Sequence, residues 1–200
     1  VFAIGTPSLS FQTGSTVYVS STFAGNVVRG AGAGGGLGLF PGVATTITGS
    51  TFSGNIAESF GGAGSGYGGG IAQRLDGSLT ISHSTVAENT GGGVAVYRGS
   101  ATVDHTIIAN NTDVDLGTNT SGEFTLSHSL VEEAPYGDFT DGGGNVIGVD
   151  PTLLPLGDNG GPTETHALGP SSPALDAGDP GFSPPPALDQ RGELRVSGPR

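Results

Sequence analysis

The chain repeats a ten-residue unit, which stands in residues 80–89 as TISHSTVAEN. Residues 46–55 read TITGSTFSGN, and residues 102–111 read TVDHTIIANN. A fourth copy, TLSHSLV in residues 125–131, lacks the final asparagine, and residues 21–26 contain an earlier relative, STFAGN. A unit this short cannot bury an apolar face alone, so its core must come from stacking one copy on the next.

The spacing of the copies indicates the length of one coil. Their closing asparagines are 29, 34 and 22 residues apart (Asn26, Asn55, Asn89 and Asn111). The shortest spacing suits one coil of a parallel β-solenoid with two or three short strands, and glycine-rich insertions account for the longer ones. Stacked coils lie about 4.8 Å apart. The expected fold is therefore all-β, a parallel β-helix of about five to seven coils.

The alternation of polar and apolar residues predicts which side chains point into the coils. In TIT, TIS and TVD one apolar residue stands between two polar ones, which is typical of a strand with one buried face. The predicted first inward column is Ile47, Ile81, Val103 and Leu126. The predicted second column is Phe23, Phe52, Val86 and Ile108.

Two features mark the predicted turns. The repeated asparagines favour turns because Asn tolerates the left-handed (αL) conformation, and we expect their side-chain amides to form a ladder between coils. Three glycines precede an apolar residue in residues 34–37, 68–71 and 91–94. This motif predicts a tight corner with positive φ, followed by the next strand.

Composition and charge exclude several classes of protein. The 200 residues include 39 glycines and 13 prolines, which disfavours a helical bundle. The chain has no cysteine, which excludes a disulfide framework and a Cys-ligated metal site. A net charge of −12 disfavours nucleic acid and anionic membranes as partners. No apolar run approaches the roughly 20 residues of a transmembrane helix, and the chain begins without the basic region of a signal peptide.

The composition changes near Asp150. Ten of the 13 prolines lie between Pro151 and Pro199, and DNGGP in residues 158–162 is a turn signal. We therefore divide the chain into a solenoid, residues 1–149, and a terminal coil with a cap or linker, residues 150–200. The open end of a solenoid exposes unpaired backbone groups, so a cap is expected there.

Two sets of motifs resemble known families. Phe-x-x-Asn in residues 23–26 and 52–55, with GGGI in residues 68–71, resembles the repeats of polymorphic outer-membrane proteins, which are right-handed parallel β-helices. The C-terminal quarter resembles the choice-of-anchor Q domain of bacterial secreted β-helix proteins, in the motifs GNVIGVDP (144–151), LPLGDNGGPT (154–163), THAL (165–168), SPALDAGD (172–179) and DQRG (189–192).

The resemblance to these families implies a right-handed β-helix, export, and attachment or assembly at the cell surface. It implies no catalytic residues. The choice-of-anchor Q domain typically continues past Arg195 into a closing strand of the type DIGAFE, which this sequence does not contain. The missing strand therefore predicts that this chain is truncated or processed.

Three histidines, His83, His105 and His128, occupy one position of the repeat, and we expect them to stack about 5 Å apart. Imidazole is a common metal ligand. Three imidazoles in a straight line do not converge on one tetrahedral ion, so the stack is predicted to be structural. Asp104, which precedes His105, is placed to orient an imidazole. Serine is too common in this chain for a Ser-His-Asp triad to be read from sequence.

Acidic loops offer oxygen ligands for calcium. The candidates are Asp113 and Asp115 in DVDLGTN, and Asp138 and Asp141 in DFTD. The first loop departs from an EF-hand, and turn preference alone explains aspartate in such loops. We predict no cofactor beyond weakly bound calcium.

The sequence leaves two classes of function open. The first is a non-enzymatic extracellular or cell-surface β-solenoid, structural or adhesive. Its partners would be a second copy joined end to end into a filament, the cell envelope or carbohydrate. The alternative is a polysaccharide lyase, hydrolase or epimerase, or a carbohydrate-binding module, on the same fold.

The enzyme alternative has little support from residue types. A glycosidase would need two facing carboxylates, and Asp104 with Glu88 or Asp76 is the least unfavourable pair. A lyase acting on acidic sugars would need bases. The chain has no lysine, and the predicted solenoid holds only Arg29, Arg74 and Arg98. We therefore predict that the protein is not an enzyme.

Overall fold

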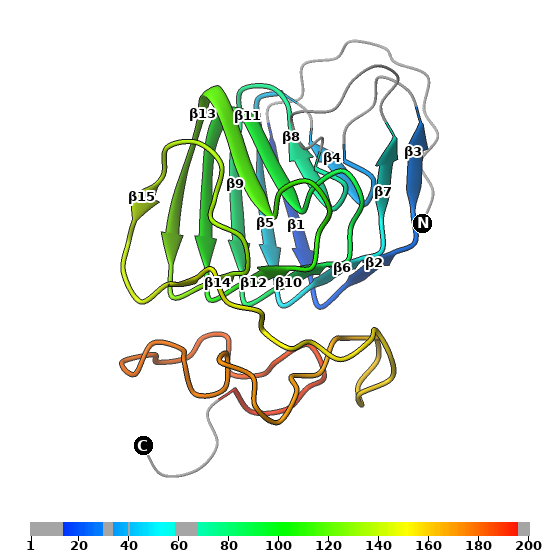
Figure 1. Ribbon diagram of the computed structural model, residues 1–200, viewed down its shortest axis with the longest axis vertical. Coiled ribbons are helices and arrows are strands. Elements are labelled where there is room, and N and C mark those ends of the chain that lie inside the picture. Colours follow the sequence, from blue (N-terminus) through cyan, green and yellow to red (C-terminus); the bar gives the residue numbers. More distant parts are fainter. Residues whose placement is uncertain (1–13, 30–33, 40, 59–67, 196–200) are drawn as a thin grey trace.

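The computed structural model describes residues 14–29, 34–39, 41–58 and 68–195. These residues form strands and turns, and the strands pair in parallel. Figure 1 shows the strands stacked side by side as the rungs of a solenoid, with the C-terminal segment running beneath them.

The longest sheet, sheet A, runs through successive coils in sequence order. Its rungs are β1 (Gly14–Val19), β5 (Val43–Thr48), β9 (Ser78–Ser82), β11 (Val94–Asp104), β13 (Leu116–Ser127) and β15 (Thr140–Asp141). Two shorter strands, β4 (Leu37–Leu39) and β8 (Ile71–Gln73), extend the sheet beside the first half of β11. In the fourth and fifth coils these two segments merge, so that β11 and β13 are long single strands.

Sheet B follows each rung of sheet A after one tight corner. It contains β2 (Thr22–Ala24), β6 (Thr51–Ser53), β10 (Thr85–Ala87), β12 (Ile107–Ala109), β14 (Leu130–Val131) and β16 (Val146–Ile147). A third sheet pairs β3 (Val27–Arg29) with β7 (Ile56–Glu58). Six successive A–B pairs give six coils in the described residues, which confirms the predicted parallel β-helix and its size.

The two predicted inward columns are confirmed. Ile47, Ile81, Val103 and Leu126 are in register on sheet A and are fully buried. On sheet B, Phe23 stacks on Phe52 with ring centroids 4.6 Å apart, and Val86 and Ile108 continue the column. A further inward column, not predicted, contains Thr45, Leu79, Ala101 and Phe124. Burying each valine, leucine, isoleucine or phenylalanine side chain of these columns stabilises the fold by roughly 1.5–3 kcal/mol.

The ladder asparagines lie at the corner after sheet B. The Oδ1 atom of Asn89 accepts hydrogen bonds from the backbone N–H and the Nδ2 of Asn55, both at 2.9 Å. Asn55 accepts the same pair from Asn26, and Asn111 accepts it from Asn89. Asp115 ends the ladder, because its carboxylate takes the place of the next amide and accepts both hydrogen bonds from Asn111.

The αL conformation at this corner belongs to the residue before each ladder asparagine, which differs from the expectation. Gly25, Gly54, Glu88 and Asn110 have φ between 57° and 64°. The asparagine itself turns its amide into the solenoid, where backbone groups of two coils need partners. A separate residue therefore makes the sharp turn.

A second ladder, which the sequence analysis did not predict, lies at the corner after sheet A. The hydroxyl of Ser84 accepts a hydrogen bond from the backbone N–H of Ser50 and donates to the carbonyl of Ser82. The hydroxyls of Ser50, Thr106 and Ser129 repeat this pattern, and that of Ser21 in the first coil donates to the carbonyl of Val19. Asn145 ends this ladder by accepting from the N–H of Ser129.

The triple-glycine motif forms the corner that leads back to sheet A. Gly34, Gly68 and Gly91 have positive φ. A methyl group added to Gly70 would lie 2.7 Å from the Gly93 carbonyl oxygen and 2.8 Å from a methyl of Val86. Glycine is required at Gly70 because the coils approach too closely for a side chain.

The C-terminal segment, residues 150–195, lies along the outer face of sheet B (Figure 1). His166 Nε2 is 2.9 Å from the hydroxyl of Ser53 on β6. Gln190 donates to Thr22 on β2 and accepts from Thr51 on β6. These contacts reach the first two coils, more than 100 residues earlier in the sequence, which differs from the expected cover at the end of the solenoid. The segment therefore forms hydrogen bonds with outward polar groups of β2 and β6.

The asparagine ladder yields a stability prediction. Asn89→Ala leaves two buried donors of Asn55 without an acceptor, so we expect the free energy of unfolding to fall by about 3 kcal/mol. Asn26 is exposed and only donates to the ladder, so Asn26→Ala is the matched control and should cost about 1 kcal/mol. Urea denaturation measures both. Equal losses in the two variants would show that the buried rungs contribute no more than the exposed one.

Candidate functional site

The three histidines lie at the corner after sheet A, each in the αL conformation. The φ angles of His83, His105 and His128 are 52°, 46° and 43°. The ring centroids of His83 and His105 are 4.8 Å apart, and those of His105 and His128 are 5.1 Å apart. Histidine is one of the few residues enriched at positive φ. The equal backbone conformation and strand spacing place the three rings in one column.

The C-terminal segment covers part of this column. The ring of Phe182 lies 5.3 Å from that of His83 and 5.4 Å from that of His105. Arg195 lies beside the start of the column, since a methyl group at Gly49 would be 3.4 Å from its Nη2 atom. No sequence signal pointed to Phe182 or Arg195, because these contacts join segments far apart in the chain.

His83 is the most enclosed member of the column. Neither of its ring nitrogens has a hydrogen-bond partner among the described residues. Burial, followed by the nearby charges of Arg195 and His105, lowers the pKa of His83 to about 4. The surroundings of His83 therefore favour the neutral form of its imidazole.

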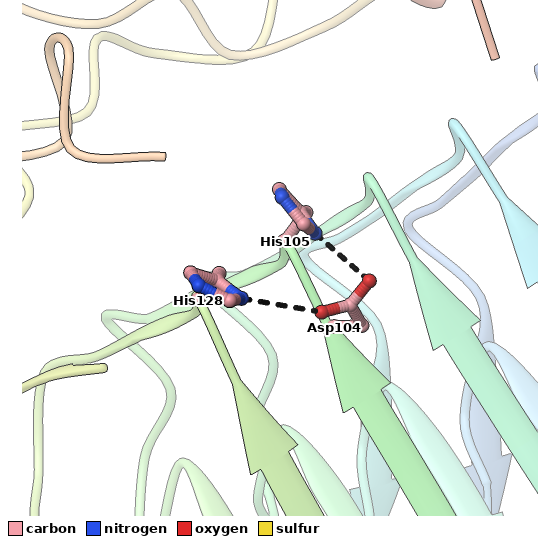
Figure 2. A group of neighbouring side chains, drawn as sticks. All are labelled: Asp104, His105 and His128. Carbon is pink, nitrogen blue, oxygen red and sulfur yellow. Dashed lines mark hydrogen bonds and ion pairs between the residues drawn. The ribbon is translucent and has the colours of Figure 1, made fainter. Parts of the chain in front are cut away.

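Asp104, His105 and His128 form a compact cluster at the end of β11 and β13 (Figure 2). His105 Nδ1 is 2.8 Å from Asp104 Oδ2, and His128 Nδ1 is 4.0 Å from Asp104 Oδ1. Figure 2 shows the carboxylate facing both rings from one side. One ligand atom from each residue lies within 4.8 Å of the other two. Within the described ranges, no other three histidine and acidic side chains come this close together.

The calcium candidates lie apart from this cluster. Asp115 is buried, with Oδ1 accepting from Asn111 and Oδ2 from the N–H of Glu133. Burial raises the pKa of Asp115 above its ordinary value. Asp141 Oδ1 accepts from Gly143 and Asn145. Asp113 and Asp138 are exposed. The structure thus uses two of the four carboxylates in hydrogen bonds of the solenoid, and calcium binding stays a prediction.

The structure does not bring together the carboxylate pairs considered for glycoside hydrolysis. Asp104 pairs with Ser82 at the end of β9, whereas Asp76 precedes the start of β9. The strand β9 alone, from Ser78 to Ser82, spans about 13 Å of extended chain. Glu88 follows β10, beyond the next corner. Two catalytic carboxylates work at about 5–9.5 Å, so the Asp76 pair is too far apart.

The outer face of sheet A carries columns of small hydroxyl side chains. The central column holds Val17, Thr46, Thr80, Thr102, Thr125 and Thr140 in register. The flanking columns hold Ser15, Ala44, Ser78, Ser100 and Glu123 on one side and Val19, Thr48, Ser82, Asp104 and Ser127 on the other. Each of these side chains is exposed or half-exposed. The repeated Thr-x-Thr and Thr-x-Ser patterns are the sequence signal for this face.

Sheets A and B differ in what covers them. Thr51 and Ser53 point outward from β6 but are buried beneath the C-terminal segment. The corresponding outward residues of sheet A have no such cover among the described contacts. Sheet A therefore presents the larger free face of the solenoid.

Comparison with known proteins supports the architecture. A family model described as "right handed beta helix region" matches residues 4–151. No curated protein and no solved structure matches the chain. The described residues form no helix of the length and apolar character that a membrane crossing requires.

The enclosed ring nitrogens of His83 predict a pH dependence of stability. Its pKa is about 4 in the folded chain and 6.5 when unfolded, so the unfolded chain binds more protons between these values. Stability should therefore rise with pH across this window and be lost as the pH falls from about 6.5 to 4.

The variant His83→Asn keeps a residue that tolerates αL and should lose stability less steeply on acidification. Urea midpoints measured from pH 7 to 4 in metal-free buffer give the comparison, because all other titrating groups are the same in both proteins. Parallel curves would contradict a role for His83.

Proposed function

The chain belongs to the right-handed β-helix family, and from that premise we propose a non-enzymatic, extracellular adhesive module. The free face of sheet A would bind a neutral, hydroxyl-rich surface such as a polysaccharide. Display outside the cell is part of this proposal and rests on the C-terminal motifs described above. The observation that carries the proposal is the in-register array of threonine and serine hydroxyls on sheet A.

The array has the regular spacing that a repeating ligand requires. Hydroxyl groups in one column recur about every 4.8 Å along the solenoid, and adjacent columns are about 6.6 Å apart along each strand. A polysaccharide surface also repeats its hydroxyl groups at fixed intervals. Many weak hydrogen bonds, each contributing about 0.5–1.5 kcal/mol, then add along the contact.

The charge distribution favours a neutral partner. The chain carries a net charge of −12, yet the three columns hold only Glu123 and Asp104 as acidic residues and no basic residue. Aromatic side chains are also missing from these columns. The acidic residues elsewhere keep the protein soluble and discourage binding to anionic surfaces.

Assembly end to end has less support from the C-terminal side of the solenoid. The last rungs, β15 and β16, contain two residues each, which offers few backbone groups for another coil. Asp115 and Asn145 also end the two inner ladders before this point. An added coil would meet neither a full strand nor an open ladder there. The lateral face is therefore the better candidate for contact with a partner.

An enzyme acting on polysaccharide remains the alternative, and one observation favours it. The cluster of Asp104, His105 and His128 borders the hydroxyl face, so a bound sugar chain would lie next to a potential base. The paired carboxylates of a glycosidase are not part of this cluster.

A binding experiment tests the proposed adhesive face. Replacing Thr46, Thr80, Thr102 and Thr125 together by valine removes four hydroxyls and keeps β-branched side chains suited to strands. We expect binding to insoluble cellulose, chitin or β-glucan to weaken by about 2 kcal/mol, or roughly thirtyfold. Pull-down isotherms measure the change. Thr90→Val, an exposed threonine outside sheet A, is the matched control and should bind as the parent chain does.

The same samples separate the two classes of function. Release of reducing ends or unsaturated products by the parent chain, lost in Asp104→Asn, would favour the enzyme. Equal binding by the parent and the valine variant would remove the hydroxyl face from the proposal.

A further inference from the structure

The geometry points to a binding site for a divalent transition metal ion, such as Zn²⁺, formed by Asp104, His105 and His128. The site would lie at the corner between sheets A and B. Its ligands would be Nδ1 of both histidines and the carboxylate of Asp104 (Figure 2). This inference does not depend on the adhesive function proposed above.

The presence of Asp104 changes the argument against a column of histidines. Three stacked rings cannot surround one ion, but two rings and a carboxylate placed to one side of them can. The Nδ1 atom of His105 is already 2.8 Å from the carboxylate, and that of His128 is 4.0 Å away. Zinc binds nitrogen and oxygen at about 2.0–2.2 Å, so tetrahedral ligand atoms lie roughly 3.3 Å apart. Small side-chain rotations at His128 would bring its nitrogen into this range.

The surroundings of the two rings leave Nδ1 as the available nitrogen in each. His105 Nε2 is buried beside Phe182 and has no hydrogen-bond partner among the described residues. His128 Nε2 lies 4.0 Å from Oδ1 of Asp179 in the C-terminal segment. A carboxylate near the far nitrogen favours the tautomer with its proton there, and a closer approach would give the hydrogen bond that is common for metal-ligating histidines. Asp179 would thus act as a positioning residue for His128.

The ligand set favours one class of ion. Two imidazole nitrogens and one carboxylate suit zinc, iron, copper or nickel, whereas calcium prefers six to eight oxygen ligands. The side chains of Asp104, His105 and His128 are 36%, 16% and 29% exposed. An ion there would keep at least one open position for water or a ligand. The net charge of −12 also attracts cations to the chain.

Among the coils that the structure describes, the site forms at Asp104 alone. Position 104 corresponds to Val19, Thr48, Ser82 and Ser127 in the other coils, and none of these offers a carboxylate. In the coil of His83, Ser82 takes the position of Asp104. Since serine is the natural residue on both neighbouring strands, Asp104→Ser removes a ligand with little reason to disturb the strand.

Titration of the metal-free chain with ZnCl₂ by calorimetry tests the site, and the visible absorption of added Co²⁺ reports on its coordination. We expect about one ion per chain, with affinity at least about tenfold weaker in Asp104→Ser and in His128→Asn. Asp76→Ser removes the same charge far from the site, and His83→Asn alters the column outside it. Both controls should bind zinc as the parent chain does.

The outcomes decide the proposal in either direction. Zinc binding that is absent from the parent chain, or unchanged in both ligand variants, would overturn it. Equal weakening in Asp76→Ser would assign the binding to general surface charge and would overturn it as well. Circular dichroism checks that the variants fold. If Asp104→Ser does not fold, the result for His128→Asn decides the test. The expected pattern is loss in the ligand variants alone, with disappearance of the tetrahedral Co²⁺ bands.

Discussion

In-register hydrogen bonding between parallel coils is the constraint on which this structure depends. Each backbone group of a coil finds its partner in the coil before or after it, so a residue has the same neighbours as its counterpart one coil away. The strands meet this requirement by themselves. The corners do not, and there side chains supply the missing partners: asparagine after sheet B, and serine or threonine after sheet A.

This constraint explains why like residues form columns. A side chain that suits a corner in one coil also suits it in the next, because the backbone and its surroundings repeat. The imidazole stack, the inward aliphatic columns and the outward threonines are all results of this repetition. The informative residues are those that interrupt a column. Asp115 and Asn145 end the two ladders, and Asp104 places a carboxylate against two imidazoles where other coils have valine, threonine or serine.

The C-terminal segment makes the two main faces unequal. It crosses sheet B as far as the first coils and contacts the histidine column through Phe182, Asp179 and Arg195. The outward side chains of β6 in sheet B are buried beneath this segment. Sheet A is left as the broad outer face. The adhesive surface that we propose needs the free face, and in the proposed metal site the segment contributes Asp179 as a positioning residue for His128.

Much of the fold could be predicted from the sequence because its information is local and repeated. The alternation in TIS and TVD indicated which side chains point inward, and the recurring asparagines, glycines and histidines indicated the corners. By contrast, the αL residue at the asparagine corner was assigned one position too late, because sequence preference alone does not separate the turn-making residue from the bonding one. The serine ladder was missed because serine and threonine are common throughout the chain.

The sequence by itself determined the period, two of the inward columns and the columns of asparagines and histidines, because these residues recur at fixed positions of the repeat. Only the tertiary structure decided that residues 150–195 cover a side face, and that Asp104 and Asp179 stand on opposite sides of His128. Those contacts join residues many positions apart that share no repeat. Their distances depend on how the chain turns back along the completed solenoid.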